Sequence, residues 1–384
     1  MERKKTAWRI LGGILMSIFI FSCVKPYEPQ ILSSANHYLV VDGIINTKAG
    51  ANTQIKLSRT NNLQDRNIYN PELMAVMNIE SKSGITYPLN PIDQNGNYSS
   101  ANLNLDPQGQ YRLNITTQNG ENFQSDFVIP KISPPIDSLS WTQNQGVQIM
   151  VNTHDPSNAT RYYRWQYINT WEYHAQLGSA WGIDHGIIFG RPANDQRYIC
   201  YNTTYSNQIL LDNSLSLSQD RIRNELIQSI PQNDSILNYR LSVLVQQYAL
   251  NAQAYSYWQI IQRNTQDIGS LFSLQPSELN GNIHSLTHPS NPVIGFLSAG
   301  TIEEKRIFIS FDNLKSWVRN PGTLFCQVNT VPQLPPNGFN SLENYPDTTF
   351  GPYYFVTFGP LFIAKKFCLD CELNGGTNVK PTFW

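Results

Sequence analysis

Short segments that alternate polar and apolar residues recur along the first third of the chain, with turn residues between them. In 109–116 the alternation places Tyr111 and Leu113 on one face, and 53–59 follows the same pattern. A period of two is typical of β-strands buried on one side, and the Gly and Asn residues between the segments are typical of turns. About seven such segments predict an immunoglobulin-like β-sandwich over residues 37–130.

A proline-dense stretch, 131–137, follows this region and predicts a linker, because proline does not fit central strand positions. Strand patterns resume beyond it, so 138–384 is predicted to be a second, β-rich domain. The expected fold class is therefore mainly β with a helical minority: two β-sandwich (immunoglobulin-like) domains, the second with helical insertions.

Two helices and one long connection are expected inside the second domain. Apolar residues at helical spacing predict a helix near 217–230, and a second helix near 251–265 would have Asn251 as its N-cap. The segment 169–191 shows no periodicity, and we interpret it as a connection between strands.

The N-terminus has the pattern of an export signal. A basic head precedes a short apolar run, 10–21, and the run leads into Ile-Phe-Ser-Cys at 20–23. As a helix the run would reach roughly 18 Å, which is too short for a ~30 Å hydrocarbon core. We interpret 1–22 as a lipoprotein signal peptide, Cys23 as the lipidated first residue and 23–36 as a tether; an ordinary cleaved signal with a chance cysteine is the alternative.

Charge and composition argue against several function classes. The chain has 27 Lys and Arg against 28 Asp and Glu, a formal net charge of −1, and no basic run. A nucleic-acid partner is therefore not expected. Membrane attachment would come from the lipid on Cys23, since no polybasic patch is present. Only 14% of residues are charged, which suits an extracytoplasmic β-protein.

Four further cysteines, Cys200, Cys326, Cys368 and Cys371, predict two disulfides in an exported protein, with three possible connectivities. The Cys-Leu-Asp-Cys spacing at 368–371 is also compatible with a zinc site or a redox motif. Zinc would require a second such pair, and the redox motif should open a helix after a strand, so we favour a structural bridge.

Several phrases along the chain, taken in order, resemble one known family. They include Leu-Val-Val-Asp-Gly-Ile-Ile (39–45), Lys-Leu-Ser-Arg-Thr (56–60), Pro-Ile-Asp-Ser-Leu (135–139), Ala-Tyr-Ser-Tyr-Trp (254–258), Gly-Ser-Leu-Phe (269–272), Gln-Pro-Ser (275–277), Gly-Asn-Ile (281–283), Gly-Phe-Leu-Ser-Ala (295–299), Cys-Leu-Asp-Cys (368–371), Gly-Gly-Thr (375–377) and Lys-Pro-Thr-Phe-Trp (380–384). Together with Ile-Phe-Ser-Cys at 20–23, which resembles a bacterial lipobox, they resemble the Bacteroidota outer-membrane lipoproteins catalogued as domain of unknown function 4249.

This resemblance implies a location and a partner, but no catalytic residues. Members of the family look like lipid-anchored outer-membrane proteins that accompany TonB-dependent receptors of the SusC type in nutrient uptake. The resemblance thus implies a β-barrel transporter as partner and an unknown nutrient as ligand. We expect the cell surface as the location, with the periplasmic face as the alternative.

Candidate site residues are few. Trp171, Tyr173 and Trp181 lie in a polar stretch and could stack on a sugar or a peptide, or bury against a partner; the alternative is that they cover the edge of the sandwich. No nucleophile, metal-ligand or cofactor motif was found, so we expect no catalytic residues, no metal and no cofactor.

The sequence as a whole predicts a non-enzymatic, lipid-anchored protein that assists a TonB-dependent transporter in capturing a nutrient. The alternative is a structural or adhesive envelope protein whose β-domains act as spacers and interaction modules. A hydrolase is a third and less favoured possibility.

Overall fold

The computed structural model describes residues 37–61, 70–184, 187–266, 281–320, 326–331, 333–334, 338–339, 349–355 and 360–384. The predicted signal peptide and tether, including Cys23, lie outside the described residues. Those described are mainly β with a helical minority, as the sequence predicts. No helix among them is long and apolar enough to cross a membrane.

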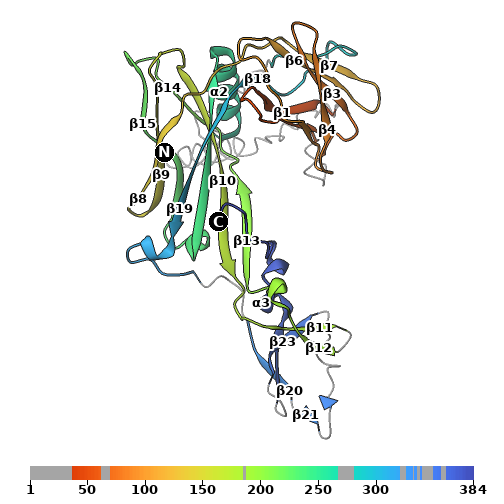
Figure 1. Ribbon diagram of the computed structural model, residues 1–384, viewed down its shortest axis with the longest axis vertical. Helices are drawn as coiled ribbons and strands as arrows, with labels where there is room; N and C mark the ends of the chain where they lie inside the picture. The colour runs from red at the N-terminus through yellow and green to blue at the C-terminus, as the bar shows by residue number, and fades with distance from the viewer. Residues whose placement is uncertain are drawn as a thin grey trace, which may run out of the picture. The chain divides into compact units, whose positions relative to one another are not determined.

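A nine-stranded sheet, part of which is labelled in Figure 1, contains the predicted strands of the first region. Its order is β17-β7-β6-β3-β4-β5-β2-β1-β18. The strands are β1 (Leu39–Asn46), β2 (Gln54–Arg59), β3 (Val76–Ser81), β4 (Thr86–Pro91), β5 (Asn97–Ser100), β6 (Tyr111–Thr116), β7 (Asn122–Ser125), β17 (Ile283–Ser285) and β18 (Ser298–Gly300).

One hydrophobic core receives side chains from all nine strands of this sheet. Tyr111 and Leu113 are buried in it as the alternation predicts, together with Ile55 and Leu57 of β2. A single sheet can enclose such a core by curling, whereas an immunoglobulin sandwich uses two separate sheets. The immunoglobulin-like form of this region is therefore not confirmed.

The later chain supplies both edges of the nine-stranded sheet. Strand β17 pairs antiparallel with β7, and β18 pairs parallel with β1. Just before β18 the backbone passes so close to β1 that a Cβ on Gly295, whose φ is +144°, would clash with the carbonyl oxygen of Val41. Residues that the sequence assigned to the second domain are thus part of the first sheet.

Two larger sheets form the main part of the second region, between Ile136 and Ser310. A five-stranded sheet has the order β13-β10-β16-β19, with β14 also paired to β10, and a three-stranded sheet has the order β15-β9-β8. Their strands are β8 (Ile136–Gln143), β9 (Gly146–Asp155), β10 (Tyr162–His174), β13 (Ile199–Tyr205), β14 (Leu210–Asn213), β15 (Asp220–Pro231), β16 (Arg240–Leu250) and β19 (Ile302–Ser310). The two sheets share one core, to which β9 contributes Ile149, β10 contributes Trp165 and β16 contributes Val243.

The helix expected near 217–230 is wrong, because strand β15 occupies most of that range. Strand β15 pairs with β9 through two register shifts, which displace the alternation of its side chains. Ile222, Ile227 and Ile230 are therefore buried, whereas Leu217 and Leu226, which the expected helical stripe combined with Ile222 and Ile230, are 47% and 44% exposed. Pairing with β9 determines the local structure.

The helix expected near 251–265 is confirmed as α2 (Ala252–Gln266). Asn251 is its N-cap, since its side-chain Oδ1 accepts a hydrogen bond from the Ala254 N–H at 2.7 Å. Ala254 and Tyr257 are buried, and Trp258 packs against the same cluster.

The connection expected over 169–191 is also wrong. Strand β10 continues to His174, because β13 and β16 pair along most of its length. A hairpin of β11 (Trp181–Asp184) and β12 (Ile187–Gly190) then occupies much of the remainder. The polar and aromatic side chains of β10 obscured its periodicity, since several of them remain partly buried on both faces.

The predicted linker, 131–137, is held by neighbouring strands. The Lys131 N–H donates to the Ala299 carbonyl at 2.9 Å, and the Ser133 N–H donates to the Thr301 hydroxyl at 2.8 Å. Strand β8 begins within this stretch, at Ile136. The prolines therefore lie in a fixed crossing between the two regions and not in a loose spacer.

The C-terminal part contains short elements held by disulfides. They are β20 (Asn329–Val331), β21 (Gln333–Leu334), β22 (Gly338–Phe339), β23 (Phe350–Phe355), β24 (Leu361–Lys365), α3 (Lys366–Leu369) and the 3-10 helix η5 (Cys371–Asn374); single 3-10 turns η1 (Ala193–Asp195), η2 (Ser235–Leu237) and η3 (Phe311–Asn313) occur earlier. Two disulfides are present, as predicted: Cys200–Cys371 and Cys326–Cys368. Each cysteine of the Cys-Leu-Asp-Cys motif thus pairs with a distant partner.

Candidate functional site

Trp171 and Tyr173 lie two residues apart on β10 and line the same groove. Trp171 is opposite Asn202 of β13, and Tyr173 is opposite Cys200. Strand β16 pairs with β10 only as far as Trp171, so Tyr173 extends beyond the end of that neighbour. Residues of β10 and β13, together with residues from neighbouring loops and 3-10 helices, therefore line the groove.

The groove has a volume of about 830 Å³ and is lined by aromatic side chains, amides and one guanidinium. We call it the aromatic groove. The aromatic members are Trp171, Tyr173, His174, Tyr198 and Tyr239; the amides are Gln176, Asn202, Asn238, Asn320 and Asn374; the guanidinium belongs to Arg319. Its volume lies within the ~300–1,000 Å³ that is typical of ligand pockets.

A stack of rings forms one wall of the aromatic groove. The His174 ring lies 3.5 Å from the Tyr239 ring, centroid to centroid, and 4.8 Å from the Tyr198 ring. Glu172 holds the imidazole from the side, with its Oε1 2.8 Å from Nε2 of His174. Burial raises the pKa of the Tyr239 hydroxyl, so the phenol stays neutral. The Tyr239 ring therefore gives the wall an uncharged aromatic face.

The polar groups beside this wall are held by backbone contacts. Arg319 lies over the Tyr239 ring, 5.2 Å from its centroid, and its Nε donates to the Asn238 carbonyl at 2.9 Å. The Asn320 N–H donates to Oδ1 of Asn238 at 2.8 Å, and Nδ2 of Asn238 donates to the Asn320 carbonyl at 2.7 Å. These contacts fix the loops in position before any ligand arrives.

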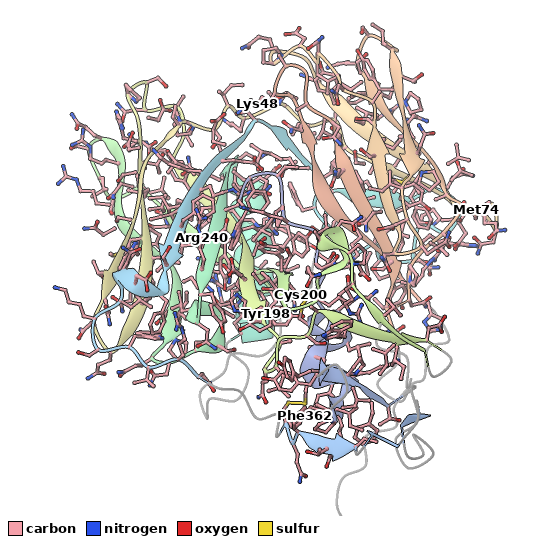
Figure 2. The ribbon with its side chains drawn as sticks, turned by 60° about the horizontal axis from the view of Figure 1, so that its bottom comes forward. Lys48, Met74, Tyr198, Cys200, Arg240 and Phe362 are labelled. Carbon is pink, nitrogen blue, oxygen red and sulfur yellow. A yellow bond between two sulfur atoms is a disulfide. The ribbon has the colours of Figure 1, made fainter. Side chains whose placement is uncertain are left out.

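Disulfides hold the C-terminal side of the groove. The Cys200–Cys371 bridge joins β13 to η5, near Tyr198 (Figure 2), and Cys326 of the second bridge lines the groove itself. The Tyr173 hydroxyl donates to the carbonyl of Cys371, which attaches β10 to the same segment. The groove therefore combines residues from distant parts of the chain through covalent and hydrogen bonds.

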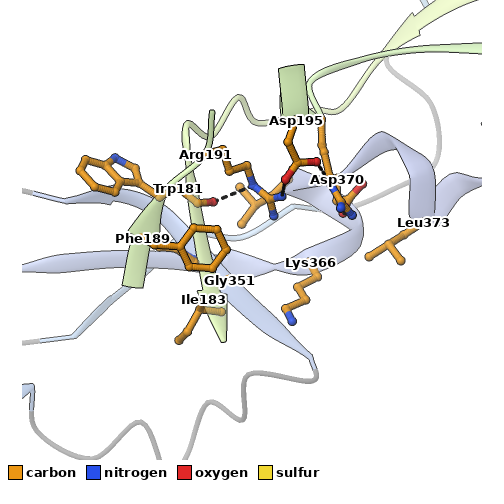
Figure 3. A pocket seen from close by; sticks show the side chains of 12 residues that line it. Trp181, Ile183, Phe189, Arg191, Asp195, Gly351, Lys366, Asp370 and Leu373 are labelled. Atoms are coloured by element: carbon orange, nitrogen blue, oxygen red, sulfur yellow. Dashed lines mark hydrogen bonds and ion pairs between the residues drawn. The ribbon is translucent and has the colours of Figure 1, made fainter. Parts of the chain in front are cut away.

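Trp181 does not belong to the aromatic groove. It lies on β11 and lines a different pocket, of about 290 Å³, together with Phe189 and Arg191 (Figure 3). The structure thus brings together two of the three aromatic residues that the sequence indicated. Trp181 contributes its backbone carbonyl, which accepts a hydrogen bond from Nε of Arg191 at 3.1 Å.

Ion pairs dominate one side of this second pocket. Arg197 contacts Asp195 at 3.0 Å, Asp370 at 2.8 Å and Glu372 at 3.2 Å, while Arg191 contacts Asp195 at 3.3 Å. Hydrogen bonding to Arg197 lowers the pKa of Asp195. Since these charges satisfy one another, we interpret the cluster as a clamp that holds η5.

Sequence reasoning did not single out several residues of the aromatic groove. His174 is the last residue of β10, and Tyr198 and Tyr239 stand immediately before strands β13 and β16. An aromatic residue at a strand end is a weak signal of a site, because loops at strand ends often carry function. Arg319 lies in a loop that gave no comparable signal.

Aromatic faces beside fixed amides suit a ligand with both apolar and hydrogen-bonding surfaces, such as a sugar or a peptide. Within the described ranges, no group of three or more His, Cys, Asp or Glu side chains is placed to hold a metal ion. The aromatic groove therefore presents aromatic faces beside hydrogen-bonding groups.

Residues 24–306 match the family described as "Domain of unknown function (DUF4249)". The chain belongs to this family. The match covers most of the chain and includes Trp171, Tyr173, His174, Tyr198 and Tyr239 of the aromatic groove. No curated protein matches this DUF4249 chain.

Among solved structures, this DUF4249 protein is similar to a DUF4785 family protein from Legionella pneumophila subsp. pneumophila str. Philadelphia 1, with 12% identity and a TM-score of 0.20. The likeness covers 54% of this chain and 52% of the other, so the chain spans about half the length of the structure that it matches.

Proposed function

We propose that this DUF4249 protein is a non-enzymatic, lipid-anchored accessory protein of the outer membrane. It holds a nutrient in the aromatic groove and partners a TonB-dependent, SusC-like transporter, with the cell surface as its location. The aromatic groove is the single observation that carries the proposal, because its stacked rings and fixed amides form a preorganised binding surface. The lipobox that ends in Cys23 and the family resemblance support the location and the partner.

The physical advantage of such a partnership is retention. A ligand released from a groove held next to a transporter entrance stays at a high local concentration there. It therefore enters the channel more often than a ligand released into free solution. The lipid on Cys23 would provide this proximity, since several acyl chains make membrane attachment long-lived.

Co-purification tests the partner. The full-length protein, solubilised in detergent, should be recovered together with a large β-barrel protein. A Cys23→Ala variant should lose both palmitate incorporation and the barrel. Recovery of the lipidated wild-type protein alone, under conditions that preserve other membrane complexes, would count against the transporter partnership.

Growth measurements test the aromatic groove and separate the proposal from a structural or adhesive role. Deletion of the gene should impair growth on one nutrient, and a Trp171→Ala copy should fail to restore it. A Trp181→Ala copy is the matched control and should restore growth, because Trp181 lies outside the groove. A defect limited to attachment or envelope integrity would favour the structural or adhesive alternative.

A further inference from the structure

A separate pocket, of about 420 Å³, lies where strands β1 and β2 of the nine-stranded sheet approach β10, β16 and β19. All of these strands belong to one compact unit. Arg164 and Lys56 supply positive charges to the lining, and Asp42 and Glu304 supply negative ones. We call it the Arg164 pocket. It shares no lining residue with the aromatic groove, so nothing below depends on the function proposed for that groove.

Arg164 is an unusual residue of this pocket, because its charge is shielded but not paired. Its guanidinium lies 3.6 Å from the centroid of the Trp258 ring and 5.7 Å from that of Tyr248. Its Nε is inaccessible to water and has no hydrogen-bond partner. Burial lowers the pKa of this guanidinium, although arginine remains protonated in proteins. A shielded N–H group without an acceptor is costly to maintain.

Two other partly buried arginines, Arg59 and Arg112, do have carboxylate partners. Arg59 contacts Glu72 and Glu121, each at 2.6 Å, and Arg112 contacts Glu80 at 2.8 Å. No carboxylate among the described residues forms such an ion pair with Arg164. Asp42 is near enough to favour the charged guanidinium, but it does not contact it.

The polar groups next to Arg164 are arranged around Tyr248. The Tyr248 hydroxyl lies 2.9 Å from Oε1 of Gln166 and 3.2 Å from Oε1 of Gln246. Nε2 of Gln246 donates to Glu304 at 2.7 Å. The Gln166 amide is thus held through its oxygen, which leaves its nitrogen able to donate to a ligand.

We propose that the Arg164 pocket binds a small zwitterion, such as a free amino acid or a short peptide. The guanidinium presents a fork of donors that matches a carboxylate, and the Gln166 amide adds one more donor. Asp42 and Glu304 are both exposed and provide oxygens for an ammonium group at the entrance. The balance of two positive and two negative side chains favours a ligand without net charge over a dianion such as phosphate.

Calorimetry on the full-length protein in detergent tests this proposal with three probes. Glycylglycine carries both charges, glycylglycinamide lacks the carboxylate and N-acetylglycine lacks the ammonium. Glycylglycine should bind at least about tenfold more tightly than either analogue, because each analogue loses one charge-assisted contact. A tenfold change in Kd corresponds to about 1.4 kcal/mol of binding free energy. Equal affinity for an analogue, or no saturable heat with glycylglycine, overturns the proposal.

Variants locate the binding. Arg164→Met preserves much of the side-chain length and should reduce affinity for glycylglycine at least tenfold. Gln166→Glu keeps an acceptor for Tyr248 but introduces a carboxylate that competes for Arg164, so it should also weaken binding, even if Arg164→Met does not fold. Arg240→Met is the matched control: Arg240 also stacks on aromatic rings and has an unpartnered Nε, but it does not line the pocket. Unchanged affinity in both pocket variants, or equal loss in the control, would show that the pocket is not the site.

Discussion

The indole Nε1 of Trp165 donates a hydrogen bond to Oε1 of Gln247 at 2.9 Å, and both side chains are fully buried between the two sheets of the second region. The Gln247 amide nitrogen then donates to the Pro134 carbonyl at 2.7 Å and lies 3.1 Å from the Thr153 hydroxyl. One buried amide therefore joins β10, β9, β16 and the proline-rich crossing.

Gln247→Leu should destabilise the protein by about 1–3 kcal/mol, because it leaves the buried Trp165 N–H and the Pro134 carbonyl without partners. Urea unfolding followed by tryptophan fluorescence measures the change. Gln148→Leu, at an exposed position of β9, is the matched control and should stay within about 0.5 kcal/mol of the wild type. Equal stability of the two variants would contradict the assigned role.

Stability should depend on pH through Glu225. Burial, with a smaller contribution from Asp212, raises the pKa of Glu225 from 4.5 to about 7. Between these values the folded chain holds a proton that the unfolded chain has released, so the free energy of unfolding falls as pH rises from about 4.5 to 7. Glu225→Gln should flatten this slope in a urea series measured across that window. Added salt should leave the pH dependence of the wild-type unfolding free energy largely intact, since desolvation is the main cause of the raised pKa. The same pH dependence in Glu225→Gln and in the wild type would refute the assignment to Glu225.

Loss of the disulfides should loosen the C-terminal side of the aromatic groove. The Cys326–Cys368 bridge closes a sequence separation of 42 residues, and Cys200–Cys371 one of 171. Chain entropy then gives about 4 and about 5 kcal/mol for the two bridges. Double serine variants of each pair should show these losses in urea unfolding. If reduction of the wild type leaves its unfolding transition unchanged, the bridges do not stabilise the fold.

The N-cap of α2 provides a smaller and local test. Asn251→Ala removes the acceptor of the Ala254 N–H and should cost about 1 kcal/mol. Asn251→Asp retains an acceptor and should remain close to the wild type. Thermal unfolding measures both, and equal destabilisation by Ala and Asp would argue against capping as the cause.

Local patterns in the sequence predicted elements whose determinants are local. The alternation around Tyr111 and the cap at Asn251 depend on neighbours within a few residues, and both predictions agree with the structure. Strand β15 was mistaken for a helix because its bulges are set by pairing with β9. Pairing between distant segments leaves little trace in a single segment.

The candidate site divides in the same way. Trp171 and Tyr173 share one strand, so their proximity follows from their spacing. Tyr239 and Arg319 line the groove because the fold places distant segments next to β10. Trp181 lies outside the groove because it belongs to the β11–β12 hairpin. The aromatic content of the sequence pointed to the region around Trp171 and Tyr173. Only the tertiary structure shows which residues line the aromatic groove.

The closing of the nine-stranded sheet by β17 and β18 has a kinetic consequence. Because its outer strands are synthesised last, the N-terminal portion cannot complete its hydrogen-bond ladder until Gly300 has emerged from the ribosome. Such non-local pairing folds slowly, so the N-terminal strands remain without their native edge partners for longer. A chain truncated before Ile283 would leave both margins of the sheet unpaired and prone to self-association.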